Sequence, residues 1–430
     1  MHPARTRRIA RDKQRRHVHL GAVNELPEPP PAFAGWRRTC GAICASQFLA
    51  TCGFAISTPF GPFYMQRELG LTEPRLLRIC TALFAAATPA MIAVFAPLWG
   101  LVGDRYGRRM MMLRANLGAG AALFAMGFVT SVPQLLGLRL LQGVFSGTQI
   151  AAQALATAEA PANRSGTVLG MLSAVMFSAA LLGSAAGGFM AEHLGCRLVF
   201  RLSGVLMLVA GTCVLLLVRE RHGKLVAPGA SARGQWRAGL GAIRPCLPLL
   251  VALGVISFTR LFDKALLPLI VQRIVGGVAG ASQATGMLML VGGTAGMLSG
   301  IIAGRLADRL PPARVALVAA VGGGCLMLPQ GLTNHLPVLF AASFGSTLFA
   351  GGLEPVFQTW LVRRTPEAMR GTVLGWAATA RAIGWTAGPL TAGAIAAASD
   401  LWQVYAVATG LYLLLLPMTL WVQRRIGSSV

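Results

Sequence analysis

A charged, glycine-containing segment, Gly100-Leu-Val-Gly-Asp-Arg-Tyr-Gly-Arg-Arg109, constrains this chain more than any other feature. It joins two long apolar stretches, and a partial copy, Gly304-Arg-Leu-Ala-Asp-Arg309, returns about 205 residues later, close to half the chain length. A charged turn between apolar segments that is repeated at this distance indicates a duplicated membrane protein. We term residues 100–109 the elbow, and we expect the two halves to move against each other.

Composition supports membrane-spanning helices, because 55% of the 430 residues are hydrophobic and only 12% are charged. A spanning helix needs about 20 mostly apolar residues. Candidate stretches occupy residues 39–65, 78–101, 109–130, 133–158, 165–191, 197–218, 246–272, 282–304, 314–331, 336–361, 371–398 and 401–422. The sequence therefore predicts an all-α membrane protein with twelve transmembrane helices in two parallel six-helix pseudo-repeats.

The chain divides into four parts on this interpretation. Residues 1–36 are rich in arginine and proline and lack the apolar core of a secretory signal, so they are predicted to be a disordered basic cytoplasmic arm that touches anionic headgroups. Residues 37–218 form the N-terminal bundle and residues 245–430 the C-terminal bundle. A basic cytoplasmic linker, 219–244, joins them.

The distribution of charge predicts the orientation. A net charge of +24 would suggest nucleic acid as a partner of a soluble protein. Here, however, most of the 38 lysines and arginines fall in the segments on one side of the predicted topology. The opposite loops carry only Arg67, Arg75, Arg78, Arg197 and Arg273. By the positive-inside rule both termini are cytoplasmic, and nucleic-acid binding is the weaker interpretation.

Neither metal nor nucleotide chemistry is predicted. The eight cysteines lack metal-ligand spacing; Cys40 and Cys44 lie one helical turn apart, so a metal pair is conceivable, but buried thiols are favoured. The six histidines lie outside the span interiors, and the sequence has no Gly-x-x-x-x-Gly-Lys-[Ser/Thr] loop. We therefore expect a protein that is not an enzyme and has no cofactor other than a proton gradient as its energy source.

The duplication extends beyond the elbow. Matching residues recur about 205 positions apart, and six spans in each half give both halves the same orientation. The matches are Pro62, Gln66 and Arg67 with Pro268, Gln272 and Arg273, Gln153 with Gln358, Gly183 and Gly188 with Gly388 and Gly393, and Gly166-Thr-Val-Leu-Gly170 with the identical 371–375.

The elbow resembles the loop signature of the major facilitator superfamily. Arg139-Leu-Leu-Gln142-Gly143 resembles the second signature of that family, and Gly183-Ser-Ala-Ala-Gly187-Gly188 the third, the antiporter motif. Residues 97–200 are similar to twelve-helix bacterial drug:proton antiporters. The resemblance implies a monomer in the bacterial inner membrane that moves small molecules by alternating access, with protons and lipid as partners and without nucleic acid. Ser184 stands where the family has proline, whereas Gly388-Pro389 keeps it in the other half, so the direction of transport stays open.

The elbow is predicted to gate the cytoplasmic side. Gly100 and Gly103 allow helices to approach closely. Asp104 is suited to accept hydrogen bonds from a helix start, which the resemblance places near Gly371, and this contact would latch the halves together. The arginines act in the latch or serve only as topological anchors. The gating set is completed by Arg105, Gly107, Arg108, Arg109, Gly304, Asp308 and Arg309.

Three residues are candidates for proton coupling. Arg139 lies inside a span, where a charge needs a partner; it either influences a nearby acid, as the resemblance implies, or bonds to carbonyls or Gln142. Arg260, Asp263 and Lys264 are spaced i, i+3 and i+4 and are therefore predicted to share a helix face in the seventh span, so Asp263 is either a proton site or their counter-ion. Glu354 has no basic residue near it in the sequence, and an isolated interior carboxyl favours its protonated form. We therefore prefer Glu354 as the coupling carboxylate.

The cargo is predicted to be drug-like or toxic and to leave the cell. The alternative is export or uptake of an endogenous anionic metabolite such as a carboxylate siderophore, because basic residues lie within the spans. The cavity candidates are Arg114, Gln149, Gln153, Arg260, Lys264, Gln358, Trp376, Arg381 and Trp385. Tight helix packing is expected at Gly183, Gly187, Gly188, Gly388 and Pro389, and along the stripe of Gly292, Gly296, Gly300 and Gly304.

Overall fold

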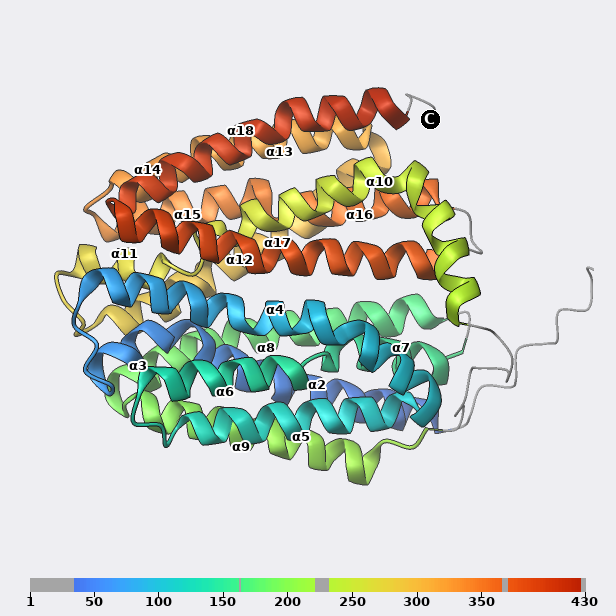
Figure 1. The fold of residues 1–430 in the computed structure, drawn as a ribbon, viewed down its shortest axis with the longest axis horizontal. Coiled ribbons are helices and arrows are strands. Elements are labelled where there is room, and N and C mark those ends of the chain that lie inside the picture. The colour runs from blue at the N-terminus through green and yellow to red at the C-terminus, as the bar shows by residue number, and fades with distance from the viewer. Residues whose placement is uncertain (1–34, 162–163, 221–231, 366–369, 427–430) are drawn as a thin grey trace, which may run out of the picture.

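The structure is a computed structural model that describes residues 35–161, 164–220, 232–365 and 370–426. All regular structure in these ranges is helical (Figure 1). The helices are α2 Trp36–Ser57, η1 Thr58–Phe60, α3 Gly61–Arg67, α4 Pro74–Tyr106, α5 Arg108–Met126, α6 Val132–Phe145, α7 Thr148–Glu159, α8 Ser165–His193, α9 Cys196–Leu217, α10 Ala232–Phe262, α11 Leu267–Val275, α12 Ala281–Arg309, α13 Pro312–Cys325, α14 Met327–Leu332, α15 Leu336–Ala350, α16 Leu353–Arg364, α17 Arg370–Ala398 and α18 Leu401–Ile426.

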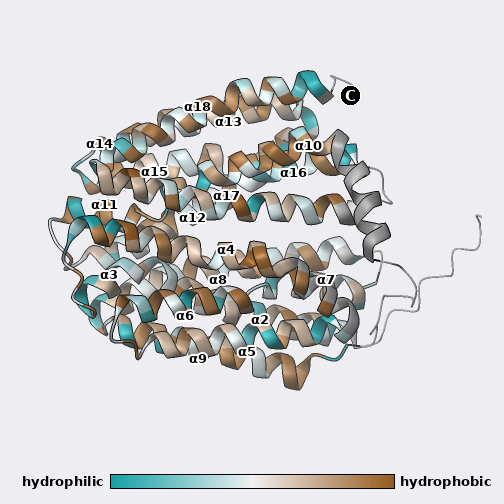
Figure 2. Ribbon diagram, viewed as in Figure 1, coloured by the Kyte–Doolittle hydropathy of each residue, from teal (hydrophilic) through white to brown (hydrophobic). Residues whose placement is uncertain are grey.

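The helices run roughly parallel in two groups, α2–α9 and α10–α18, that lie side by side (Figure 1). Every expected span is helical, and within the described ranges nine stretches are long and apolar enough to cross a membrane by length and composition. The helices that fall short are α5, α6–α7 and α17, and each contains an interior arginine: Arg114, Arg139 or Arg381. Many large apolar side chains are exposed, as expected of a surface in contact with lipid. Figure 2 shows that hydrophobic residues occur along the helices of both halves.

Helices of the two halves are interrupted at corresponding places. The fourth span breaks at Ser146 and Gly147, where Gly147 has a φ of +118°, and the tenth breaks at Gly351 and Gly352. At membrane depth, irregular backbone is tolerated where protein buries it or where it lines a cavity. Matched interruptions in two repeats therefore indicate where a small-molecule site is built.

The expected linker stays a prediction. Its residues 232–244 are helical and belong to α10, which begins at Ala232, whereas residues 221–231 lie outside the described part of the chain, as do residues 1–34 of the expected arm. The expected common helix face in the seventh span is wrong, because α10 ends at Phe262 and α11 begins only at Leu267. Arg260, Asp263 and Lys264 consequently do not share a helical face.

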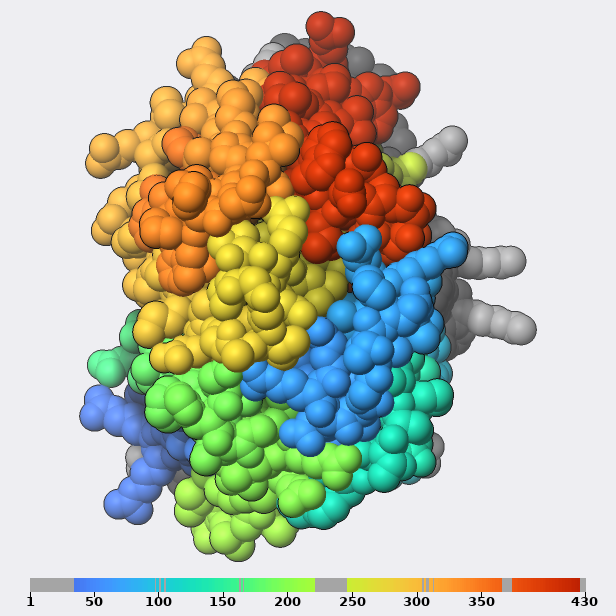
Figure 3. Space-filling model, turned by 90° about the vertical axis from the view of Figure 1, so that its left-hand side faces the viewer, coloured from blue at the N-terminus to red at the C-terminus, as the bar shows by residue number. Residues whose placement is uncertain are grey.

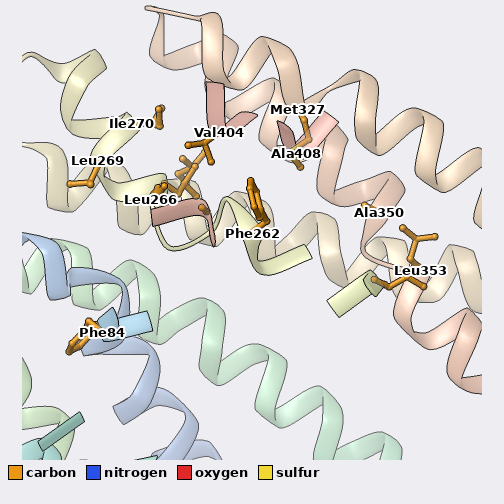
Figure 4. Packing of buried hydrophobic residues seen from close by; sticks show 14 of the residues in the cluster. Phe84, Phe262, Leu266, Leu269, Ile270, Met327, Ala350, Leu353, Val404 and Ala408 are labelled. Atoms are coloured by element: carbon orange, nitrogen blue, oxygen red, sulfur yellow. The ribbon is translucent and has the colours of Figure 1, made fainter. Parts of the chain in front are cut away.

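The core of the C-terminal half surrounds this second interruption. Phe262, Leu266 and Leu267 are almost fully buried there, and Figure 4 shows Phe262 and Leu266 lying near Val404 and Ala408 of α18. Burying such side chains contributes roughly 1.5–3 kcal/mol each relative to exposure in water. Apolar packing on both sides therefore fixes the turn that carries Asp263 and Lys264.

The two halves touch at the end of the molecule that carries α3 and α11, which we term the Gln66 end. The Gln66 and Gln272 side chains exchange two hydrogen bonds, of 2.9 and 2.8 Å. Arg67 donates to Glu192 of its own half at 2.9 Å and to the carbonyl oxygen of Val278 in the other half. Figure 3 shows this end as a continuous surface to which both halves contribute.

Glycines show that the halves diverge toward the opposite, elbow end. A methyl group on Gly188 of α8 would lie 2.7 Å from the Ser282 carbonyl oxygen of the other half. Nearer the elbow end, a methyl group on Gly170 of α8 or on Gly375 of α17 would meet nothing within 4 Å. The helices thus pack tightly near the Gln66 end and separate toward the elbow.

The expected glycine packing is found only in part. Gly183 and Gly187 lie against the backbone of Cys52 and Ile56 in α2, and Gly388, followed by the buried Pro389, lies against Phe258 of α10. The stripe on α12 does not pack as expected, because methyl groups on Gly292 and Gly300 would meet nothing within 4 Å and one on Gly296 would meet only Thr347, at 3.6 Å. The physical reason is that the close contacts of α12 are on other faces: a methyl group on the adjacent Gly293 would overlap the Leu181 side chain of α8, and Ser299 and Ala303 lie against Gly351 and Gly352.

This geometry predicts that Gly188→Val separates the halves at the Gln66 end, whereas Gly170→Val on the same helix does not. The valine at 188 would overlap Ser282 and Gly286, and the valine at 170 enters open space. Spin-label distances between the halves at the Gln66 end should lengthen only in Gly188→Val. Equal distances in the two variants would contradict the packing described here.

Candidate functional site

The elbow is held by an acid that the sequence analysis missed. Glu220, just beyond α9, accepts hydrogen bonds from the backbone N–H groups of Arg108 and Arg109 at 2.9 and 3.0 Å. These groups begin α5, so a carboxylate caps the positive end of that helix. Gly107 has a φ of +93°, and a methyl group there would lie 2.7 Å from the Glu220 Oε2 atom. Glycine is required at this position for both reasons.

The side chains of Arg108 and Arg109 in the elbow donate hydrogen bonds to neighbouring helices. The Arg108 guanidinium donates to the Ala154 carbonyl oxygen of α7, and that of Arg109 donates to Leu215 of α9 at 2.7 Å. A methyl group on Gly103 would lie 3.0 Å from the Met111 side chain, consistent with a close approach of α4 and α5. The elbow therefore ties α4, α5, α7 and α9 together.

Part of the expected latch falls outside what the structure describes. This applies to the side chains of Asp104, Arg105 and Asp308, to the surroundings of Gly100 and Gly304, and to Gly371. The backbone of residues 304–309 lies in the last turns of α12, where Arg309 is exposed. The latch between Asp104 and the start of α17 stays a prediction.

Arg139 lies in the N-terminal half and is fully buried, with 1% of its surface exposed. It donates to the Phe84 carbonyl oxygen at 3.3 Å and to Gln142 Oε1 at 2.6 Å. Its guanidinium carbon lies 4.4 Å from the centre of the Phe84 ring. Among the described residues no acid forms an ion pair with Arg139, so carbonyl, amide and ring contacts hold this charge.

Arg114 marks the interruption of the fourth span. Its guanidinium stacks over Trp99 at 3.6 Å and donates to the carbonyl oxygens of Val144 and Ser146 at 3.3 and 3.4 Å. The carbonyls that the break between α6 and α7 leaves free are thereby paired. On the other side of the break, Gln47 of α2 donates to Thr148 Oγ1 at 2.6 Å.

Glu354 follows the matching interruption in the C-terminal half and is not isolated. One carboxylate oxygen accepts from Arg260 of α10 at 2.8 Å, and the other accepts from Arg381 of α17 at 3.2 Å. The expectation of a carboxyl without a basic neighbour is therefore wrong, because both arginines are distant in sequence and adjacent in space. Glu354 lies in the first turn of α16, where the helix dipole also favours an anion.

Asp263 has a different partner. Its carboxylate is completely buried and lies 3.4 Å from the Lys264 ammonium, while Arg260 turns to Glu354 instead. Arg260 and Lys264 line a cavity of about 210 Å³ between α10, α14, α15 and α18. The cavity is also lined by Ser346, Thr347 and Tyr412, whose hydroxyl groups are suited to hydrogen bonding.

The remaining cavity candidates vary in exposure. Arg381 lies over the Trp385 ring at 5.7 Å, and Trp376 and Gln358 are half-buried. In the first half Gln153 is half-buried and Gln149, which corresponds to Glu354 in the repeat, is exposed. The described contacts thus bring Arg260, Glu354 and Arg381 together and leave Arg114 and Arg139 in separate clusters of the other half.

Comparison with known proteins identifies the family of this chain. The model of the family described as Major Facilitator Superfamily matches residues 43–389 and 252–428. The chain belongs to the major facilitator superfamily. It is 30% identical to multidrug resistance protein MdtG of Salmonella arizonae, over 90% of this chain and 95% of that protein, and 30% identical to MdtG of Klebsiella pneumoniae, over 88% and 92%.

A solved structure shares the fold of this major facilitator chain. It is a bacterial homologue of the human lysosomal transporter Spinster in an inward-facing and occupied conformation, with a TM-score of 0.74 and 14% sequence identity. The match covers 91% of this chain and 98% of that one. The family consists of multi-pass membrane transporters of small molecules, which agrees with the apolar spans found among the described residues.

The contacts at the elbow predict that Glu220→Ala loosens the start of α5. Loss of a capping acceptor costs roughly 1 kcal/mol, so the Arg108 and Arg109 amides should exchange hydrogen about fivefold faster. Glu73→Ala is a matched control, because Glu73 caps α4 by accepting from the Leu76 N–H at the opposite end of that helix. Hydrogen-exchange mass spectrometry should show each change only at its own helix start. Unchanged exchange at 108–109 in Glu220→Ala would contradict the cap.

Proposed function

We propose that this protein is a secondary active transporter that exports drug-like or toxic small molecules across the cytoplasmic membrane in exchange for protons. The single observation that carries the proposal is Glu354, an almost buried carboxylate that follows a helix interruption and holds two arginines. The relatives of this chain in Salmonella arizonae and Klebsiella pneumoniae are named multidrug resistance proteins, which supports this class of cargo.

Glu354 is suited to couple proton binding to a change of shape. Its ionised carboxylate joins α10, α16 and α17, whereas a protonated carboxyl would attract neither guanidinium as strongly. Protonation would therefore loosen the contact among three helices of one half. Proton-driven alternating access requires a contact of this kind, which is closed when the carboxylate is ionised and looser when it is protonated.

The orientation follows from the charge distribution. We propose that the elbow end and both termini face the cytoplasm, because the basic segments gather there. On this assignment the halves are closed on the outside, through Gln66, Gln272 and Arg67, and diverge toward the inside. We further propose that the protein works as a monomer in the inner membrane.

A second candidate function is export or uptake of an endogenous anionic metabolite. The observation in its favour is the excess of buried positive charge. Two arginines share the single carboxylate of Glu354, and within the described ranges Arg139 and Arg114 form no ion pair with an acid. A cavity with this charge balance attracts anions and repels lipophilic cations.

Glu354→Gln is predicted to abolish proton-driven transport, whereas Glu354→Asp retains part of it, because only aspartate keeps a titratable group. Accumulation of a labelled panel of lipophilic cations and organic anions should be measured in expressing cells. Asp263→Asn serves as a control for loss of a buried acid, and an uncoupler serves as a control for the energy source. Transport by Glu354→Gln at the wild-type rate would remove Glu354 from the mechanism.

Arg381→Ala separates the two candidate functions. If the cargo is anionic, this variant should lose most transport of organic anions, because Arg381 supplies one of the two guanidinium groups that contact Glu354. Transport of lipophilic cations should be unchanged or improved. Unchanged movement of organic anions would leave drug efflux as the only candidate.

A further inference from the structure

The Arg260 and Arg381 side chains are more exposed than the Glu354 carboxylate that they contact. The Glu354 side chain is 11% exposed, whereas those of Arg260 and Arg381 are 32% and 22% exposed. Each guanidinium contacts the carboxylate through one terminal nitrogen. The acid is therefore the inner member of the cluster, and the cations keep surface that a ligand can reach.

The cluster carries more positive than negative charge. Two guanidinium groups face one carboxylate, and the neighbouring Lys264 is balanced by Asp263. Among the described side chains, the helices packed against α16 add no acid to the cluster: α15 has no ionisable residue, and α12 and α13 present Arg305, Arg309 and Arg314, which are exposed at their elbow ends. Asp308 of α12 also lies at that end, and its side chain is outside the described part of the chain. Arg363 and Arg364 lie in the last turn of α16, at the opposite end of the helix from Glu354.

Hydrogen-bond donors remain available around the two arginines. The Arg381 Nε atom is buried and has no partner among the described residues. Arg260 lines the cavity of about 210 Å³ together with Lys264 and Tyr412, and its ion pair with Glu354 joins this cavity to Arg381. Guanidinium, ammonium and phenolic hydroxyl groups are donors that bind a carboxylate.

We propose that the cargo carries a carboxylate group that binds to Arg260 and Arg381, and that Glu354 takes up one proton when it binds. A second carboxylate beside Glu354 makes it unfavourable for both to be ionised, so the nearer acid protonates. Protonation in turn frees both guanidinium groups for the cargo. The proton comes from water and joins a Glu354 oxygen, and no bond of the cargo is made or broken.

The two binding events support each other. If the carboxylate of the cargo strengthens proton binding at Glu354, the proton strengthens binding of the cargo by the same factor. A cationic cargo would have the opposite effect, since it would favour ionised Glu354 and expel the proton. The charge of the cargo therefore determines whether cargo and proton bind together or compete.

This inference rests on the transporter function proposed above, and it favours the second of its two candidates. Cargo and proton that bind together also cross the membrane together, whereas an exchanger requires them to compete for the empty carrier. The triad of Arg260, Glu354 and Arg381 is then a site for an organic acid and a proton.

The test uses the full-length protein in lipid nanodiscs and three probes that share a ring: benzoate, benzamide and benzyltrimethylammonium. Isothermal titration calorimetry in buffers of different ionisation enthalpy measures the protons bound with each probe. Benzoate should bind about tenfold or more tightly than benzamide, with uptake of about one proton per molecule. Arg381→Met should weaken benzoate binding and leave benzamide unchanged.

Variants of the acids identify the site of the proton. Benzoate should bind to Glu354→Gln without proton uptake and with an affinity that no longer falls as pH rises. Glu354→Asp and Asp263→Asn should retain proton uptake, which separates the effect from misfolding. Benzoate binding no tighter than benzamide, including no binding at all, would overturn the inference. So would proton uptake that persists in Glu354→Gln, or preference for the cation with proton release.

Proteoliposomes separate this inference from the function on which it rests. The three probes and a lipophilic dye are loaded, and their movement is followed after a pH gradient is imposed. Movement of the cation or dye, together with a negative benzoate result, would leave the transporter function intact and refute the anionic site. A gradient that moves none of the compounds would refute the proposed function itself.

Discussion

The two ion pairs that join Glu354 to Arg260 and Arg381 hold three helices of the C-terminal half around one buried charge. In a membrane such charges are expensive unless they are paired, so the contact fixes how α10, α16 and α17 approach one another. The interruption at Gly351 and Gly352 makes the contact possible, because it places Glu354 in the first turn of a new helix. The fold of this half and its proposed chemistry therefore share the same residues.

The halves use one duplicated framework differently. At the position of Glu354 the first half has Gln149, and at the position of Arg260 it has Phe54, whose ring lies 5.3 Å from the Arg139 guanidinium carbon. The first half thus holds the interior arginines Arg114 and Arg139 with carbonyl oxygens, an amide and aromatic rings, whereas the second half holds Arg260 and Arg381 with a carboxylate. Among the described residues, the duplicated framework therefore pairs its interior arginines with an acid in the C-terminal half.

The spans, the duplication and the elbow were predictable because hydropathy and repeated motifs are local in sequence. The partners of Glu354 were not, since Arg260 and Arg381 lie on other helices and only packing brings them together. Glu220 was missed for the same reason, although an acid directly after the last apolar residues of α9 is a usable signal for a cap. The glycine stripe on α12 was predicted to pack tightly and does not, because the spacing of glycines alone cannot say whether a second helix lies opposite them.

The reciprocal hydrogen bonds between Gln66 and Gln272 join a residue to its own counterpart in the repeat. A side chain can do this only if it both donates and accepts, as an amide does; two carboxylates or two ammonium groups would repel each other. The pseudo-twofold axis of the molecule must pass close to this pair. The same bonds would form between two identical copies of a six-helix half, so this contact would serve a symmetric dimer of single halves as well as it serves the fused chain.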